Sequence, residues 1–257
     1  MKRRFTGVGI ALCFLFSASF GQAASAEAEI GLTANLAHGV HAEETATAQF
    51  AVLPFPILSI RHRSKRLELF AESLVPIGPI RFIGGTVGQP QSSQLGYLSG
   101  VLRYYTANGR LYVGAGASEI VQRTVYVPFE FTHGSFHVTD GEIDTSRLAG
   151  ARYEVGALLA DSPSHRIRVS LAALPSIRAT LNEHAFTAGS INHSHDFFIP
   201  EHASLVDTSI SIERTFHNHV SLVYGVRYVN VSAAFEDGSL ADRNRFVAPF
   251  VGITRRI

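Results

Sequence analysis

Apolar and polar residues alternate along most of the chain that follows a short apolar leader. Between residues 149 and 159, the apolar positions include Tyr153, Val155 and Leu159, and Arg152 and Glu154 occupy positions between them. Alternation with a period of two residues is typical of β-strands that have one apolar face. The pattern predicts ten strands, over residues 28–39, 46–61, 65–78, 95–106, 110–126, 146–160, 165–181, 202–216, 219–235 and 243–257.

The connections between these strands alternate in length. The short ones are expected at residues 62–64, 107–109, 161–164 and 217–219, and the long ones at 79–94, 128–145 and 182–201. Tight turns at one end of an up-and-down sheet and long loops at the other are typical of barrels in the bacterial outer membrane. We therefore expect an all-β fold: a single up-and-down antiparallel transmembrane β-barrel of about ten strands, with both chain ends on the periplasmic side.

The strand over residues 46–61 fits this pattern least well. Pro54 and Pro56 cannot donate ladder hydrogen bonds, and proline in a central strand is unfavourable. We expect a bulge or a kink near the barrel rim at this point. If the segment is not a strand, the alternative is a barrel of eight strands with a different N-terminus.

The first 26 residues predict a signal peptide. Basic residues follow Met1, an apolar run extends over residues 8–20, and Ala24-Ser25-Ala26 provides small residues for cleavage. The apolar run is too short to span a membrane as a helix. We expect cleavage near Ala26 and a barrel domain over residues 27–257. Cys13 lies in the leader and is the only cysteine, so the mature chain would form no disulfide and no cysteine-based metal site.

The polar face of the strands carries charged residues at mid-strand positions. A soluble β-sandwich would turn this face to water, whereas a small membrane barrel would turn it inward and pair the opposite charges across the lumen. The loop pattern and the leader favour the second arrangement, and the net charge of +1 gives no indication of nucleic-acid binding. The expected lumen network comprises Arg66, Glu68, Glu72, Arg103, Arg152, Glu154, Arg168, Asp207, Glu213 and Arg227. It could line a narrow pore or plug the barrel, and the small strand number favours the plug.

The hairpins over residues 95–127 and 146–181 and the terminal strand over 245–257 resemble small monomeric β-barrels of the bacterial outer membrane. Val251, Ile253 and Ile257 follow the alternation of a terminal assembly strand, although Arg255 interrupts it and Ile257 replaces the usual aromatic residue. The resemblance implies an outer-membrane location, membrane lipid as a partner, a monomer and no cofactor. Because the chain has no tryptophan, an interfacial girdle would use Tyr and Phe, such as Tyr97, Tyr104, Tyr105, Tyr126, Phe197, Phe198, Phe216 and Phe246.

Histidine is concentrated in and beside the last long connection. Imidazole and carboxylate groups are suitable ligands for zinc, copper or nickel. A divalent metal or another surface ligand could therefore bind there, although histidines in an exposed polar loop are often only solvated. Calorimetry with zinc at neutral pH distinguishes the two cases, because no heat of binding would exclude the metal site. The candidate metal ligands are His184, His193, His195 and His202.

A hydrolase site at the barrel rim is the other chemical possibility. His202, Ser204 and Asp207 are the required residue types. Successive side chains of a strand point to opposite faces, so Asp207, at an odd position, should face away from His202 and Ser204, at even positions. We expect no catalytic residues and a non-enzymatic protein with a structural or surface-binding role, and narrow permeation of small solutes is left open beside it. The alternatives are a rim enzyme acting on lipid or peptide, and a soluble periplasmic barrel that carries an apolar ligand and has its two faces reversed.

Overall fold

The computed structural model describes residues 27–42, 47–74, 90–126, 129–133, 136–162, 164–175, 177–187, 190–198, 202–216, 219–234 and 240–257. Among these residues there is no helix that is long and apolar enough to cross a membrane. The expected signal peptide lies outside the described residues. The strands are β1 (Glu27–Ala42), β2 (Thr47–Ser64), β3 (Leu67–Leu74), β4 (Pro90–Tyr105), β5 (Leu111–Tyr126), β6 (Phe129–His133), β7 (Phe136–Asp161), β8 (His165–Leu174), β9 (Ile177–Thr187), β10 (Ser190–Phe198), β11 (His202–Thr215), β12 (Val220–Ala234) and β13 (Leu240–Arg256).

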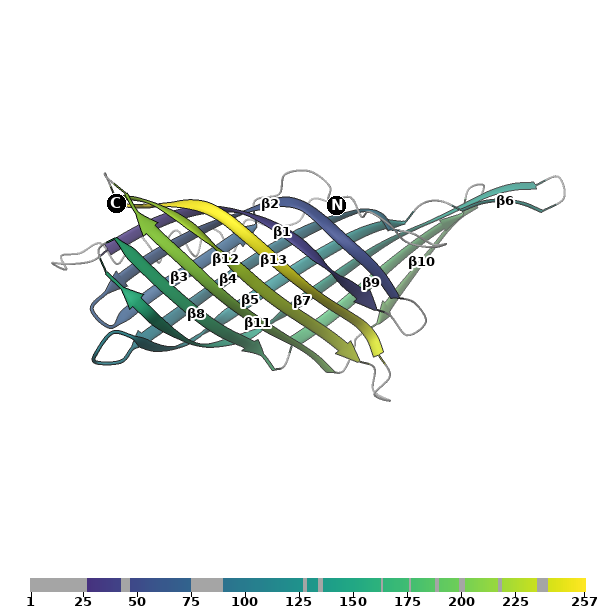
Figure 1. Ribbon diagram of the computed structural model, residues 1–257. Coiled ribbons are helices and arrows are strands. Elements are labelled where there is room, and N and C mark those ends of the chain that lie inside the picture. Colours follow the sequence, from purple (N-terminus) through teal and green to yellow (C-terminus); the bar gives the residue numbers. More distant parts are fainter. Residues whose placement is uncertain are drawn as a thin grey trace.

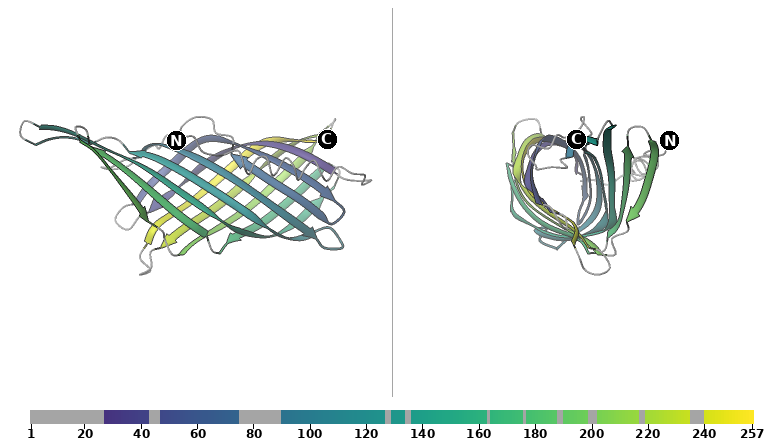
Figure 2. Two further views of the ribbon diagram at one scale, coloured as in Figure 1. Left: turned by 180° about the vertical axis from the view of Figure 1, so that it is seen from behind. Right: turned by 90° about the vertical axis from the view of Figure 1, so that its right-hand side faces the viewer.

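Ten of these strands close into a cylinder. Each pairs antiparallel with its neighbours in the order β1, β2, β3, β4, β5, β7, β8, β11, β12 and β13, and β13 returns to β1. The strands are strongly tilted (Figure 1), and a view turned toward one end shows the rounded cross-section (Figure 2). The predicted all-β, ten-stranded antiparallel barrel is confirmed, and the eight-stranded alternative is wrong.

Two of the three predicted long loops are instead extensions of the sheet. Residues 129–133 and 136–140 form the β6–β7 hairpin, and residues 177–187 of β9 pair with both β7 and β10. These strands project beyond the barrel at the end opposite the C-terminus (Figure 1). The alternation did not predict them because a ribbon that projects from the cylinder gains its backbone hydrogen bonds without needing one apolar face.

In β2, one feature differs from the prediction and another agrees with it. The strand continues to Ser64, so the first tight turn lies at Lys65–Arg66 and not at residues 62–64. Lys65 has a φ of 52°, the positive value that two-residue hairpin turns require at a central position. The β1–β2 register shifts between Asn35, which pairs with Phe55, and Ala37, which pairs with Val52. This shift is the expected bulge next to Pro54, at the position where the proline could not extend a regular ladder.

The two faces of the cylinder have opposite chemistry. Leu111, Val113, Tyr153 and Val155 point outward and are 50–60% exposed. Glu68, Arg103 and Glu154 point inward and are 0%, 3% and 2% exposed. A soluble protein would bury the first set and expose the second. The terminal strand follows the same rule, since Val247, Val251 and Ile253 are exposed on the outer face and Ala248 and Thr254 are buried.

Candidate functional site in the barrel lumen

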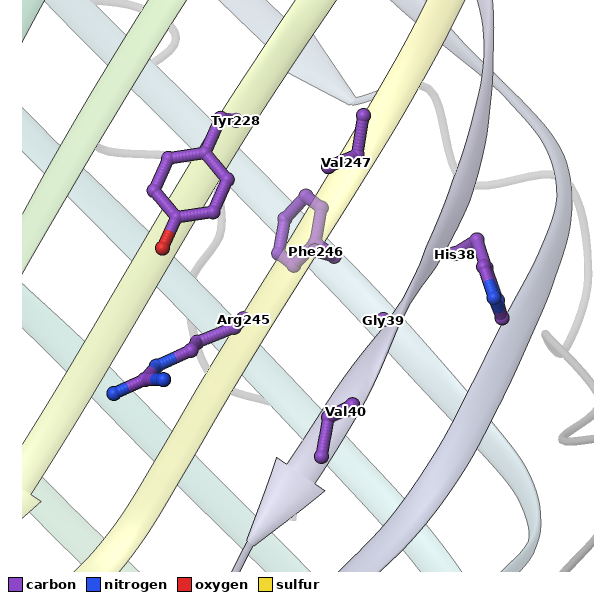
Figure 3. A pocket seen from close by; sticks show the side chains of 7 residues that line it. All are labelled: His38, Gly39, Val40, Tyr228, Arg245, Phe246 and Val247. Atoms are coloured by element: carbon purple, nitrogen blue, oxygen red, sulfur yellow. The ribbon is translucent and has the colours of Figure 1, made fainter.

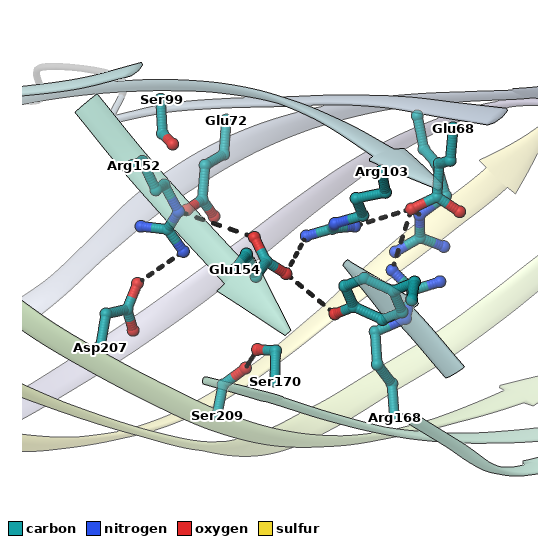
Figure 4. Close-up of polar contacts among 12 residues, drawn as sticks. Glu68, Glu72, Ser99, Arg103, Arg152, Glu154, Arg168, Ser170, Asp207 and Ser209 are labelled. Atoms are coloured by element: carbon teal, nitrogen blue, oxygen red, sulfur yellow. Dashed lines mark hydrogen bonds and ion pairs between the residues drawn. The ribbon is translucent and has the colours of Figure 1, made fainter. Parts of the chain in front are cut away.

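Glu68 lies at the centre of the buried charges in the half of the lumen nearer the short turns. Its carboxylate is 2.7 Å from a guanidinium nitrogen of Arg103 and 3.4 Å from one of Arg168. The Tyr105 hydroxyl donates a hydrogen bond to it at 3.0 Å. Arg168 is on β8, on the far side of the cylinder from β3, so this contact crosses the lumen (Figure 4).

A second group of ion pairs lies one layer closer to the projecting hairpins. Asp207 is 2.9 Å from Arg152 and 2.6 Å from Arg227. Arg227 is also 3.0 Å from Glu72, which accepts a hydrogen bond from the Tyr97 hydroxyl. Because Arg227 is on β12 and Glu72 is on β3, this contact also spans the lumen.

Glu154 joins the two layers. Its carboxylate is 2.8 Å from Arg103 of the first layer and 3.6 Å from Arg152 of the second. The Tyr112 hydroxyl donates to it at 2.8 Å. Gly156 makes this last contact possible, because a Cβ at that position would overlap the Tyr112 ring.

The network reaches every wall of the cylinder. Toward the short turns, Arg61 is 2.9 Å from Glu29 and 3.7 Å from Glu68, and Glu213 lies 3.5 Å from Arg166. Arg256 is 3.9 Å from the same Glu213. Each of the ten barrel strands therefore contributes at least one side chain, from Glu29 of β1 to Arg256 of β13, and opposite charges stand in close balance, as buried charges require.

Apolar side chains replace the charges at the end of the lumen nearer the projecting hairpins. Leu205 and Val229 are buried there, on the next inward positions to Asp207 and Arg227 toward the hairpins. The buried cluster comprises Leu174, Ile177, Ala203, Leu205, Val229, Val231 and Ala233, with Ile120, Leu148 and Phe246 packed against it. The described part of the lumen thus has an ionic region, made of the two layers of ion pairs, and an apolar region beyond it.

The structure brings nine of the ten expected lumen residues to the interior and leaves one outside. Glu68, Glu72, Arg103, Arg152, Glu154, Arg168, Asp207, Glu213 and Arg227 are buried or half-buried and ion-paired. Arg66 is the exception: it occupies the turn before β3, is exposed, and its guanidinium donates to the Tyr104 hydroxyl at 3.4 Å. A turn residue lies outside the strand alternation, so parity could not place it.

Several residues of the lumen network were not among those predicted to line the lumen. Glu29, Arg61 and Arg166 have the same inward parity as their charged neighbours, and that parity was the available signal. Tyr97 and Tyr105, expected in the outer girdle, instead serve the lumen as hydrogen-bond donors. The outward aromatic residues among the described side chains are Tyr104, Tyr153, Phe216, Tyr224 and Tyr228.

The four candidate metal-ligating histidines lie on the projecting hairpins and at the start of β11. The backbone register pairs His195 of β10 with His184 of β9, and His193 lies two residues from His195. Their side chains are outside the described ones, so the metal site stays a prediction. Among the side chains that are described, no group of three or more His, Cys, Asp and Glu is placed to hold a metal ion.

The residue types of a hydrolase are divided between the two faces of β11. Ser204 is exposed on the outer face, whereas Asp207 is 3% exposed in the lumen and bonded to two arginines. A serine nucleophile needs its base and orienting carboxylate on the same side of the strand. This pair therefore cannot act together.

Comparisons with known proteins agree with this architecture. No protein family matches the sequence, and no curated protein is significantly similar to it. The solved structures that resemble the fold include the outer membrane protease OmpT from Escherichia coli, with a TM-score of 0.60, 7% identity and coverage of 90% of this chain and 96% of that one. The fold is that of a bacterial outer-membrane β-barrel. Another similar structure is the translocator domain of the autotransporter NalP from Neisseria meningitidis, with a TM-score of 0.50, 11% identity and coverage of 97% and 95%. At these identities the likeness concerns the fold alone.

Proposed function

We propose that this chain is a non-enzymatic outer-membrane β-barrel that is closed by its own side chains and acts through its projecting hairpins. The observation that carries the proposal is the cross-lumen ion-pair network. An aqueous channel would leave the charged lumen groups accessible to water, as in large porins. Here Glu68 is fully buried, and Arg103, Glu154 and Asp207 are nearly so.

The arrangement of the two faces supports a position within the bilayer. The outward side chains are mainly aliphatic and aromatic, and the ladder closes without an exposed edge around the cylinder. In hydrocarbon, only such closure satisfies the backbone polar groups of strands. A soluble carrier of an apolar ligand needs the reverse distribution, so this alternative has no support in the packing.

The surface-binding role is assigned to the hairpins that extend beyond the cylinder. β6 pairs only with β7 among the described strands, and β10 only with β9, so each leaves one strand edge open. In single-chain barrels the long connections face the cell exterior and the short turns face the periplasm. Since buried side chains occupy the described part of the lumen, the projecting sheet is the part best placed to meet another molecule. Its open edges could accept an added strand.

Electrical recording tests the closed lumen. The purified, refolded chain inserted into a planar bilayer should give no current steps above those of the protein-free membrane, because charged and apolar side chains fill successive layers. A large porin reconstituted in parallel serves as the positive control for insertion and detection. Reproducible discrete steps from the wild-type chain would show a continuous water path and would overturn the proposal.

A further inference from the structure

A shallow cavity lies on the outer face of the barrel, where β1, β13 and β12 meet. It has a volume of about 230 Å³ and is lined by His38, Gly39, Val40, Tyr228, Arg245, Phe246 and Val247. His38, Val40, Tyr228, Arg245 and Val247 are all exposed on the outward face of their strands. Figure 3 shows Tyr228 and Arg245 on one side of the cavity and His38 on the other. The cavity surface is mainly apolar, and the side chains of Arg245 and His38 lie at its margins.

The position of this cavity coincides with one boundary of the apolar band. Along β13, the outward residues between Arg245 and Arg255 are Val247, Pro249, Val251 and Ile253. Ten residues of a strand tilted by about 40° rise by roughly 25 Å, which is the height of the apolar band of an outer-membrane barrel. The two arginines therefore lie at opposite membrane interfaces. Arg245 is at the end that carries the projecting hairpins.

The neighbouring strands place the same boundary at the same level. On β12, the outward series changes after Tyr228 from apolar and aromatic residues to Asn230 and Ser232. On β1, His38 pairs with Val247 and Val40 pairs with Arg245. A tyrosine at this depth is typical of the aromatic girdle, and an interface is where lipid headgroups lie.

The described outward side chains at the margin of the cavity include arginines and no acidic residue. Arg243 is the next outward residue of β13 beyond Arg245 and adds a second guanidinium to the margin. The described outward residues around the cavity are His38, Val40, Tyr228, Asn230, Ser232, Arg243, Arg245 and Val247, and none of them is acidic. Arg245 forms no ion pair with a carboxylate of the described residues. A guanidinium that no described carboxylate pairs with, at a membrane interface, suits a phosphate group.

We propose that this cavity binds a phosphorylated glycolipid of the outer leaflet, of the lipid A class. Arg245, with Arg243 and His38 beside it, holds a phosphate of the headgroup, and the apolar surface over Val40 and Val247 receives the first part of an acyl chain. The inference rests on the membrane position proposed above, but it is independent of whether the lumen conducts. It gives the barrel a specific lipid partner rather than a general hydrophobic solvent.

Native mass spectrometry of the purified barrel in detergent tests this site. Purified bisphosphorylated lipid A should form a one-to-one adduct, and removal of its phosphates should weaken binding about tenfold or more, since a charge-assisted hydrogen bond is lost. Arg245→Gln should give a similar loss. Arg255→Gln is the matched control, because Arg255 lies on the outward face of the same strand at the opposite interface, and this variant should bind as the wild type does.

The outcomes separate the site from its alternatives. Excess inorganic phosphate should not displace the lipid; if phosphate alone occupies the site equally well, the acyl contact is absent and the proposal is wrong. Equal binding of phosphorylated and dephosphorylated lipid, or equal loss in the two arginine variants, would also overturn it. The heat-dependent gel shift of folded barrels checks that each variant is folded. His38→Gln provides a second variant at the site and should weaken lipid binding less than Arg245→Gln does.

Discussion

Replacement of Glu68 by alanine should destabilise the barrel by about 3–5 kcal/mol, the cost of breaking a buried ion pair by removing one partner. Glu68 is the carboxylate toward which Arg61, Arg103 and Arg168 converge, with closest N···O distances of 3.7, 2.7 and 3.4 Å. Without it, these guanidinium groups lose their shared partner, and Arg103 and Arg168 are left buried without it. Urea unfolding in lipid vesicles, followed by circular dichroism, measures the change.

Glu119→Ala is the matched control for this variant. Glu119 also forms an ion pair with an arginine, Arg147, but these side chains are 28% and 61% exposed. Exposed pairs contribute about 0–1 kcal/mol, so the control should unfold at nearly the wild-type urea concentration. If Glu68→Ala were no less stable than Glu119→Ala, the network would not be a structural plug.

Replacement of Val226 by arginine should cost about 2–4 kcal/mol, as charged side chains do on the lipid face near the bilayer midplane. Val226 is 40% exposed on β12 and pairs with Pro249, in the middle of the outward apolar series of β13. On a soluble protein, arginine at such an exposed position would be nearly neutral. The same vesicle-based unfolding measurement therefore reports the solvent that this face meets.

Ser232→Arg tests the dependence on depth. Ser232 lies on the same face of the same strand, beyond the boundary marked by Tyr228. An arginine there should cost about 0–1 kcal/mol, because its charged group reaches the headgroup region. Equal effects of the two arginines, or a tolerated Val226→Arg, would mean that the outer face is not embedded in hydrocarbon.

The barrel itself could be predicted because strand alternation is both a local and a global requirement. Because lipid surrounds the barrel and side chains pack its lumen, apolar outward residues and inward residues must alternate along every strand. The charged residues of β7, β8 and β11 could therefore be assigned to the lumen from their positions in the sequence. Register and tilt then follow from closure. Arg66 could not be placed in this way, because the turn at Lys65–Arg66 shifts the strand boundary by two residues.

The content of the lumen could be predicted only in part. The valines Val223, Val229 and Val231 disturb the alternation of β12, and this irregularity was the signal of the apolar layer, since Val229 and Val231 are inward residues packed with Leu205. The particular ion pairs could not be predicted. Arginine and glutamate side chains are long, and a partner such as Glu72 for Arg227 is fixed only when the cylinder closes and brings β3 opposite β12.

The most direct test of the central claim, that the apolar face meets lipid and the ionic face is enclosed, uses an introduced tryptophan. The chain has no tryptophan, so Tyr224→Trp on the outer face and Tyr97→Trp in the lumen each give a single fluorescent reporter. In vesicles of phosphatidylcholine brominated along its acyl chains, the first should be strongly quenched and the second should not. Quenching of the lumen reporter with an unquenched outer one would contradict the account.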